Sequence, residues 1–385
     1  MSAAASEAPP RGIWEIPGQP RAVEVLQRAV ATGELGHAWA FTGPEGVGQE
    51  HAARSLTAAL VCPHEPAGCG ACHPCQRALA GTHPALQAFA PTGAMHRVED
   101  VRTRWLPAAS LSAGEGGWKV LHVRLADRMN LAAANAFLKG LEEPPPRTVW
   151  LLDLADPDAL PETILSRCRP LRFAALDAAT LADLAADLPF DDEGDRALAV
   201  RACLGSPARL AELADGGLAA LRAHRAVPRR MRAETQAVAI EEAFAIEQRA
   251  EARAKAAAKD LADQRDELKE LHGGTLPREL TAEFESAENR RKRDARTAVV
   301  RGALDDLASW YRDVLLVGTG GDPAEAVHAD DPEGLAADAA AIPPAALLAG
   351  LDAILTTREA LAANAQPRLA VEALLMGLAA DALGR

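Results

Sequence analysis

The sequence predicts an α/β domain with a parallel sheet, followed by two helical regions. Within the first 173 residues, short apolar stretches of strand length alternate with helical stretches, an order typical of a doubly wound parallel sheet. A glycine-rich turn follows the first of these strands. From residue 174 onward the chain is rich in Ala and Leu, and aromatic residues make up only 4% of the whole chain, which favours helices.

The elements of the first domain follow from the apolar pattern. We expect helices over 20–31, 51–61, 98–106 and 131–142, and strands over 36–42, 118–125 and 148–154. Asn130 is predicted to cap the helix that begins at Leu131, because a side-chain oxygen at this position accepts a bond from an unpaired helical N–H. The triplet Pro144-Pro145-Pro146 ends that helix.

The rest of the chain is predicted to be helical in two parts. Short helices over 174–222 are expected to form a small domain of their own. Residues 223–385 are expected to form a larger helical domain, in which two long charged helices flank the break GGTLP. These two helices, over 231–271 and 278–317, predict a helical hairpin.

Composition limits the function classes. A length of 385 residues suits two or three domains. No apolar run reaches the length of a membrane span, and the first residues lack a secretory pattern, so we expect a cytoplasmic protein without a membrane partner. A net charge of −13 argues against a general nucleic-acid coat, although it permits a few local phosphate contacts or DNA held by a larger assembly.

The turn after the first strand is a degenerate phosphate-binding loop. A working loop reads G-x-x-x-x-G-K-[ST], in which the Lys contacts the phosphates and the hydroxyl binds Mg²⁺. Here Gly43, Gly46 and Gly48 keep the turn, but Gln49 replaces the Lys and Glu50 replaces the hydroxyl residue. We therefore expect a strand-to-helix turn that binds no nucleotide productively.

The second half of such a site is also altered. An acidic pair should end a later strand, where it holds Mg²⁺ and orients water. The strand over 118–125 instead carries Arg124 and Leu125 at these positions, and Asp127 follows two residues later with a different expected direction. Two separate losses predict that the chain neither binds nor hydrolyses ATP productively.

Four closely spaced cysteines predict a metal site. Their spacing is C-x6-C-x2-C-x2-C, and they are Cys62, Cys69, Cys72 and Cys75. Four thiolates favour a tetrahedral structural zinc, while disulfides or a redox pair are the alternatives. His64 and His73 could replace one thiolate but are expected to be exposed bystanders. Cys168 and Cys203 are expected to be packing residues.

Four stretches together resemble a known family. They are HAWAFTGPEGVG, the cysteine cluster, ANAFLKGLEEPPPRTVWLL and TILSRCRPLRF. In this order they resemble the delta prime subunits of the bacterial DNA polymerase III clamp loader, and the Ala/Arg-rich composition with its long charged insertion resembles the actinobacterial form. The resemblance is dense over 14–173, looser over 205–214, and reappears over 347–378.

The resemblance implies a fold and a set of partners. It implies an AAA+ domain, related to the P-loop NTPases, over 1–173 with a zinc module at 62–75. A lid over 174–222 and a helical collar over 223–385, with its hairpin over 231–317, would follow. The implied partners are gamma/tau ATPase subunits and a delta subunit in a five-subunit ring, the sliding clamp and primed DNA. The implied location is the cytoplasm, at the nucleoid through the replisome.

The resemblance also implies a role for one arginine. In this family the Ser-Arg-Cys arginine reaches into the nucleotide site of a neighbouring ATPase subunit, and the match places that role on Arg167. A planar, permanently charged guanidinium is suited to stabilise phosphoryl charge. The alternative is that Arg167 and Arg169 are ordinary surface arginines.

Two further departures point the same way. Asp153-Leu154-Ala155 stands where active members carry a polar sensor, and Arg209 is out of register for a nucleotide-sensing arginine. They favour a non-hydrolysing delta prime subunit. The alternatives are an active gamma/tau-like ATPase subunit of the same machine and a zinc-dependent DNA-binding regulator.

Other charged and aromatic residues are candidates for binding roles. The basic run 290–293 is expected to be a solvated helix face, with DNA or partner contact as the alternative. Trp310 and Tyr311 are expected in a helical core. Three arginines could touch template phosphates in an assembled ring: Arg97, Arg102 and Arg104.

Overall fold

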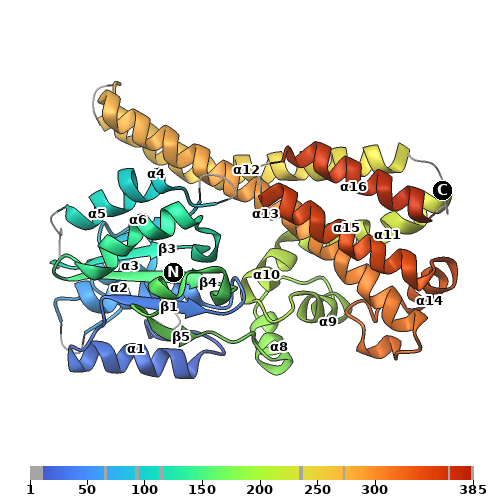
Figure 1. Cartoon of the computed structure of the whole chain (residues 1–385), viewed down its shortest axis with the longest axis horizontal. Helices are drawn as coiled ribbons and strands as arrows, with labels where there is room; N and C mark the ends of the chain where they lie inside the picture. Colours follow the sequence, from blue (N-terminus) through green and yellow to red (C-terminus); the bar gives the residue numbers. More distant parts are fainter. Residues whose placement is uncertain are drawn as a thin grey trace, which may run out of the picture. The chain divides into compact units, whose positions relative to one another are not determined.

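The structure is a computed structural model that describes most of the chain (Figure 1). The described residues are 12–64, 67–91, 95–111, 117–233, 237–271, 274–362 and 365–382. The chain divides into two compact units, one of Met1–Leu188 with Cys203–Ala211 and one of Pro189–Ala202 with Glu212–Arg385. Residues 174–222, predicted as a lid, are divided between these units, and the three-domain division remains a prediction.

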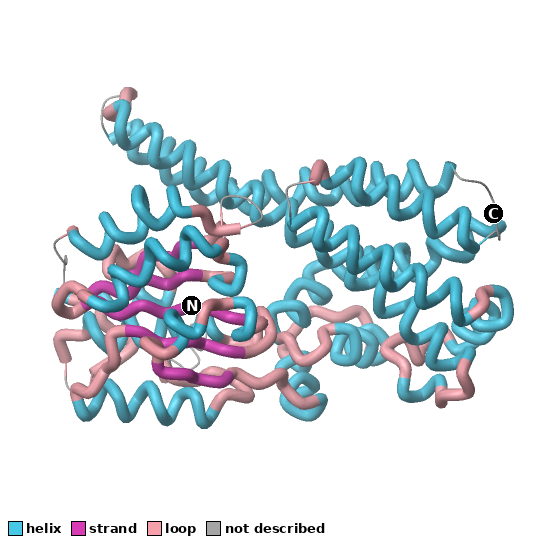
Figure 2. Tube along the Cα trace, in the orientation of Figure 1, coloured by secondary structure: helices cyan, strands magenta, loops and turns pink. Residues whose placement is uncertain are grey.

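The first unit contains the predicted parallel sheet (Figure 2). Its five strands lie in the order β2-β3-β4-β1-β5 and all pair in parallel. Their bounds are β1 Ala38–Thr42, β2 Leu86–Phe89, β3 Lys119–Val123, β4 Thr148–Leu154 and β5 Arg169–Arg172. The α/β fold class is therefore confirmed.

The two edge strands were missing from the prediction. β2 buries only Phe89, and β5 buries only Leu171 and contains Pro170. An edge strand has a neighbour on one side only, so it tolerates a proline and needs no continuous apolar run. The three central strands are almost wholly buried, and their apolar runs are what the prediction detected.

The first unit also contains helices. They are α1 Pro20–Thr32, α2 Gln49–Val61, α3 His73–Leu79, α4 Val98–Asp100, α5 Leu106–Ser110, α6 Leu131–Glu142, α7 Glu162–Leu165 and α8 Ala178–Ala186. α6 has the predicted bounds, and Asn130 Oδ1 accepts a hydrogen bond of 2.8 Å from the Ala133 N–H as expected.

The predicted helix over 98–106 differs from the structure. A π-helical turn, Val101–Trp105, joins α4 to α5, and the helical path continues to Ser110. The wider turn directly precedes Leu106 and Pro107, and a proline has no N–H for a regular helical bond. Trp105 from this turn is fully buried and packs edge-on against Phe137, which in turn packs against Trp150 in the core under the sheet.

The second unit is helical. Its helices are α9 Glu193–Ala202, α11 Leu218–Ala233, α12 Ala237–Leu271, α13 Arg278–Gly318, α14 Pro332–Ala341, α15 Pro344–Ala362 and α16 Pro367–Ala382, while α10 Pro207–Glu212 ends at the boundary of the units. α12 and α13 lie side by side as the predicted hairpin (Figure 1). Trp310 and Tyr311 are buried in its core, as expected.

Among the described helices, none is by itself long and apolar enough to cross a bilayer. One pair, Pro332–Ala341 with Pro344–Leu361, reaches the required length and composition together but is bent by 105° at its break.

Candidate nucleotide loop, cysteine cluster and exposed arginine

The degenerate loop connects β1 to α2, as predicted. Gly43, Gly46 and Gly48 all have positive φ angles, of 145°, 77° and 122°. A Cβ atom on Gly43 would lie 2.0 Å from the carbonyl oxygen of Phe173, so this position accepts glycine alone. α2 begins at Gln49, two residues before the predicted start, which places Gln49 in the first helical turn directly after the loop.

Gln49 closes the loop upon itself. Its side chain is only 5% exposed, and its Nε2 donates a hydrogen bond of 2.7 Å to the Pro44 carbonyl. The Val47 N–H donates to Gln49 Oε1 at 3.2 Å. In a phosphate-binding loop the backbone N–H groups point at the phosphates. Here one of these donors is used by the side chain that replaces the Lys.

Neighbouring segments of the same unit also hold the loop. Gln19 Nε2 donates to the carbonyl oxygens of Val47, at 3.0 Å, and Ala174, at 2.7 Å. The Gly46 carbonyl accepts bonds of 3.3 Å from the Ser206 hydroxyl and the Ala208 N–H. Gln19, which belongs to no motif recognised in the sequence, thus ties the loop to the chain after β5.

The charged residues around the loop differ from those of a working magnesium site. Glu50 stands at the hydroxyl position, and Arg54 Nη2 lies 2.5 Å from its Oε1. Burial opposes ionisation of Glu50, but the guanidinium groups of Arg124 and Arg54 outweigh it and lower the pKa of this carboxyl. Arg124 follows β3, where an active enzyme carries an acid. A carboxylate thus replaces the hydroxyl that would bind Mg²⁺, and a guanidinium follows β3 where an acid would hold Mg²⁺.

The remaining positions of the predicted site have structural partners. Asp127 Oδ2 accepts bonds of 3.2 Å from the N–H groups of Ala155 and Asp156, so it holds the turn after β4. His122 Nε2 lies 2.7 Å from Asp153 Oδ2, which pairs the polar sensor position with the neighbouring strand. The Arg209 N–H donates to Ser206 Oγ at 3.2 Å.

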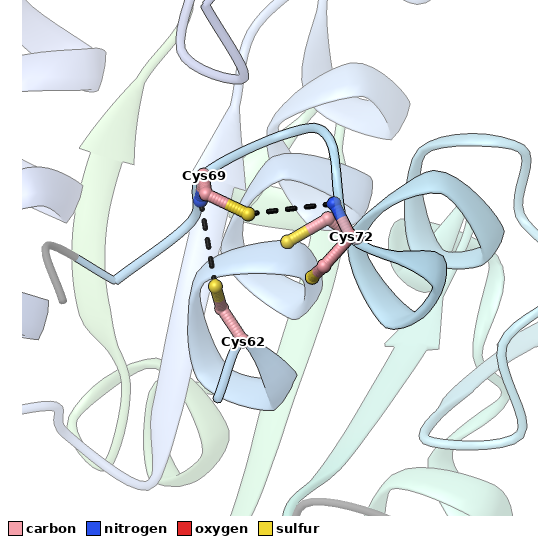
Figure 3. Close-up of side chains that lie close together, drawn as sticks. Cys62, Cys69 and Cys72 are labelled. Atoms are coloured by element: carbon pink, nitrogen blue, oxygen red, sulfur yellow. Dashed lines mark hydrogen bonds between the residues drawn. The ribbon is translucent and has the colours of Figure 1, made fainter. Parts of the chain in front are cut away.

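The four cysteines form one cluster, as the spacing predicts. Their sulfur atoms all lie within 4.8 Å of one another (Figure 3). The Cys69 N–H donates to Cys62 Sγ and the Cys72 N–H donates to Cys69 Sγ, both at 3.4 Å. All six cysteines of the chain belong to the described residues and are unbridged thiols. His64 and His73 are exposed and lie outside the cluster, whereas Cys168 and Cys203 are buried.

The four cysteines form a ligand set that suits a metal, and their thiols differ in acidity. Burial raises the pKa of Cys62, but N–H groups from Cys69, His64 and Gly68 outweigh this effect and lower the pKa to about 6. Burial raises the pKa of the Cys75 thiol. Four soft sulfur donors from the end of α2, the following loop and the start of α3 match the ligand set of structural zinc.

Arg167 lies between α7 and β5 on the surface of the first unit. Its Nη1 donates to the Thr163 carbonyl at 2.8 Å, and its Nη2 lies 2.7 Å from Glu142 Oε1. The Arg167 side chain is 37% exposed, while the adjacent Cys168 is buried under the sheet. In the Ser-Arg-Cys segment the cysteine is therefore packed in the core, while the arginine side chain lies at the surface. Glu142, the partner, was not singled out by the sequence.

The other basic residues differ in their surroundings. Arg97 and Arg102 are exposed, whereas Arg104 pairs with Asp100 at 3.0 Å and covers the Phe89 ring. Lys292, within the run 290–293, lies 3.6 Å from Glu288. The side chain of Arg290 falls outside the described residues.

One family model matches a large part of the first unit. The family model of the DNA polymerase III delta subunit matches residues 18–177. The chain is 39% identical over 135 residues to the DNA polymerase III subunit delta' of Pseudomonas aeruginosa, a match of 34% of this chain and 41% of the relative. It is 33% identical over 169 residues to subunit delta' of Bacillus subtilis, covering 43% of this chain and 50% of the relative.

Two further matches have other names. Subunit tau of Escherichia coli is 32% identical over 170 residues, which cover 44% of this chain and 26% of the relative. A gamma subunit-related protein of Thermotoga maritima has a TM-score of 0.43 at 16% identity, covering 93% of this chain and 99% of that one.

The chain thus matches half or less of the length of these curated relatives. The match includes the loop, the cysteine cluster and the Ser-Arg-Cys segment. Over residues 18–177 the chain is therefore similar to the DNA polymerase III delta subunit family and to its delta' subunits.

Proposed function

We propose that this chain is a clamp-loader subunit of DNA polymerase III that hydrolyses no ATP itself and supplies Arg167 to the nucleotide site of a neighbouring subunit. Its partners would be gamma/tau ATPase subunits and a delta subunit, and the assembly would load a sliding clamp on primed DNA. The names of the relatives, delta' and tau, support this assignment.

One observation carries the non-hydrolysing part of the proposal. Gln49 occupies the Lys position, and both its Nε2 and its Oε1 form hydrogen bonds with the backbone of its own loop. Catalysis of phosphoryl transfer depends on cations that neutralise the transferred group. With Gln49 and Glu50 in the loop, and Arg124 in place of an acid, the site lacks the phosphate-binding Lys, the Mg²⁺-binding hydroxyl and the acidic residue after β3. The same features argue against an active gamma/tau-like ATPase.

The exposure of Arg167 supports its role in trans. A guanidinium carries five N–H donors in a rigid plane and stays charged at all physiological pH values. Delivered to a neighbour's γ-phosphate, it would stabilise the charge of the transition state, an effect worth roughly 10³–10⁵ in kcat where such arginines are known. Its position on a short surface turn, backed by buried Cys168, gives it both access and support.

We further propose that the cysteine cluster holds a structural zinc ion. A bound zinc would join the end of α2, through Cys62, to α3, which begins beside Cys72 and contains Cys75. Four thiolates leave no open coordination position, so the ion would contribute to folding and not to chemistry. We also propose a lid over 174–222, a helical collar over 223–385, and a cytoplasmic location at the replisome.

Reconstitution tests the arginine. The chain, its ATPase partners, a sliding clamp and primed DNA would be combined, and DNA-stimulated ATP turnover would be measured with Arg167→Ala and with the matched variant Arg172→Ala. Arg172 is also exposed, at the end of β5. We expect a fall of about 10²-fold or more for Arg167→Ala alone. Equal turnover of both variants and the wild type would refute the proposed role.

A further inference from the structure

We propose that Glu142 is a positioning residue that orients Arg167 for the neighbour's nucleotide. The proposal rests on the function proposed above and adds a second residue to it. Glu142 is the last residue of α6, and Glu142 Oε1 lies 2.7 Å from Arg167 Nη2. No other described carboxylate lies within ion-pair distance of Arg167.

The arginine is held from two separate elements. Glu142 holds one end of the guanidinium from α6, and the Thr163 carbonyl of α7 accepts a bond of 2.8 Å from Nη1. Contacts at both terminal nitrogens fix the plane of the group as well as its position. The end of α6 is itself fixed, because Pro144 follows Glu143 and cannot extend the helix.

The held guanidinium still has donors for a ligand. Among the described residues its side chain makes two hydrogen bonds, and a guanidinium has five N–H groups. The Arg167 side chain is 37% exposed and that of Glu142 is 50% exposed. An incoming phosphate can therefore reach the remaining N–H groups while the existing two bonds hold the plane.

The ion pair between Glu142 and Arg167 is better suited to orient the guanidinium than to stabilise the fold. Ion pairs this exposed contribute little to folding, since water screens the charges and the long side chains lose freedom. Restricting an arginine before its target arrives does reduce the entropy lost on engagement. A removed orienting contact should therefore lower the neighbour's turnover without altering the stability of the chain.

Because Glu142 is charged, it could also restrain Arg167 instead of orienting it. Two variants of Glu142 distinguish these roles. As a carboxylate it could restrain Arg167 by neutralising it, and its removal would then raise turnover. Glu142→Gln keeps an acceptor oxygen at the same reach and removes the charge. Glu142→Ala removes both. Orientation through the hydrogen bond predicts that Gln retains function and Ala loses it, whereas restraint predicts a gain with both.

The experiment uses the reconstituted assembly with clamp and primed DNA. We expect Glu142→Ala to lower the kcat for ATP by about tenfold with the KM unchanged, and Glu142→Gln to stay within about twofold of the wild type. Glu143→Ala is the matched control, because Glu143 is the exposed neighbour in sequence. All variants should keep the wild-type melting temperature.

A double variant tests whether Glu142 acts through Arg167. If it does, Glu142→Ala should have no further effect in an Arg167→Ala background. Equal loss in that background, unchanged kcat in Glu142→Ala, or faster turnover in both Glu142 variants would overturn the proposal while leaving the role of Arg167 intact. Unchanged turnover in Arg167→Ala would overturn both proposals, so the two failures are distinguishable.

Discussion

At the residue scale, Gln49 links the loss of a catalytic side chain to the shape of the loop. The sequence predicted the loss of the Lys, since residue identity alone decides charge. It could not predict that the Gln amide would bond to both Pro44 and Val47, because these contacts depend on the path of the loop backbone. Gln49 therefore lacks the charge of a Lys and stabilises the turn through these two bonds.

Restoring a lysine at position 49 is expected to destabilise the folded chain. Gln49→Lys removes two hydrogen bonds and places a charge in a position that is 5% exposed, so we expect the free energy of unfolding to fall by about 1–3 kcal/mol. Urea denaturation would measure it, with the exposed Gln27→Lys on α1 as the control. Equal stability of both variants would show that the Gln49 contacts contribute nothing.

His96 provides a prediction about pH. Burial lowers the pKa of His96 to about 4, below its ordinary 6.5, and its Nε2 lies 2.8 Å from the Arg124 carbonyl. The unfolded chain therefore binds a proton at this residue at a higher pH than the folded chain. The stabilisation from neutral His96 is complete above pH 6.5 and is lost as the pH falls from 6.5 to 4, by on the order of 3 kcal/mol.

Comparison with His96→Gln isolates this residue, since glutamine keeps an N–H donor and does not titrate. The free energy of unfolding, measured in urea between pH 7.5 and 4, should fall more steeply for the wild type than for the variant. Parallel curves would contradict the assignment of a buried neutral His96.

At the element scale, the helices and strands that could be predicted are those with a continuous buried run or with residues that mark their ends. β4 and α6 could be predicted to the residue, because β4 is a continuous buried run and Asn130 and the prolines mark the ends of α6. The edge strands β2 and β5 could not, since they bury one residue each. The cysteine spacing predicted the cluster, but α3 inside it was missed. The contact of Glu142 with Arg167 joins two elements 25 residues apart and has no local signal.

The cysteine cluster gives a prediction about metal removal. We expect one zinc per chain by elemental analysis, and a lower melting temperature after a strong chelator removes it, because the metal would hold α2, the loop and α3 together. Cys69→Ser, at the exposed ligand, should lose most of the zinc, whereas Cys203→Ala, outside the cluster, should keep it. A metal-free chain with unchanged melting behaviour would refute a structural zinc site.

At the scale of the whole molecule, the recognisable features lie in one unit. The loop, the cysteine cluster, Glu142 and Arg167 all belong to the unit that contains the sheet. The family match ends at residue 177, and the helical unit with its charged hairpin lies beyond it. The hairpin could be predicted from its two long helical stretches and the break between them. The division of residues 174–222 between the two units could not, because it depends on tertiary contacts that leave no local sequence pattern.

The central claim is that the loop of this chain holds no nucleotide, and it can be tested on the isolated protein. Isothermal titration calorimetry with ATP and with ADP, in the presence of Mg²⁺, measures nucleotide binding to the loop directly. We expect no saturable heat up to about 1 mM nucleotide, because the loop lacks the phosphate-binding Lys. A Kd weaker than about 1 mM corresponds to a binding free energy of less than about 4 kcal/mol. Stoichiometric binding in the micromolar range, weakened by a substitution at Gly46 or Gln49, would contradict it.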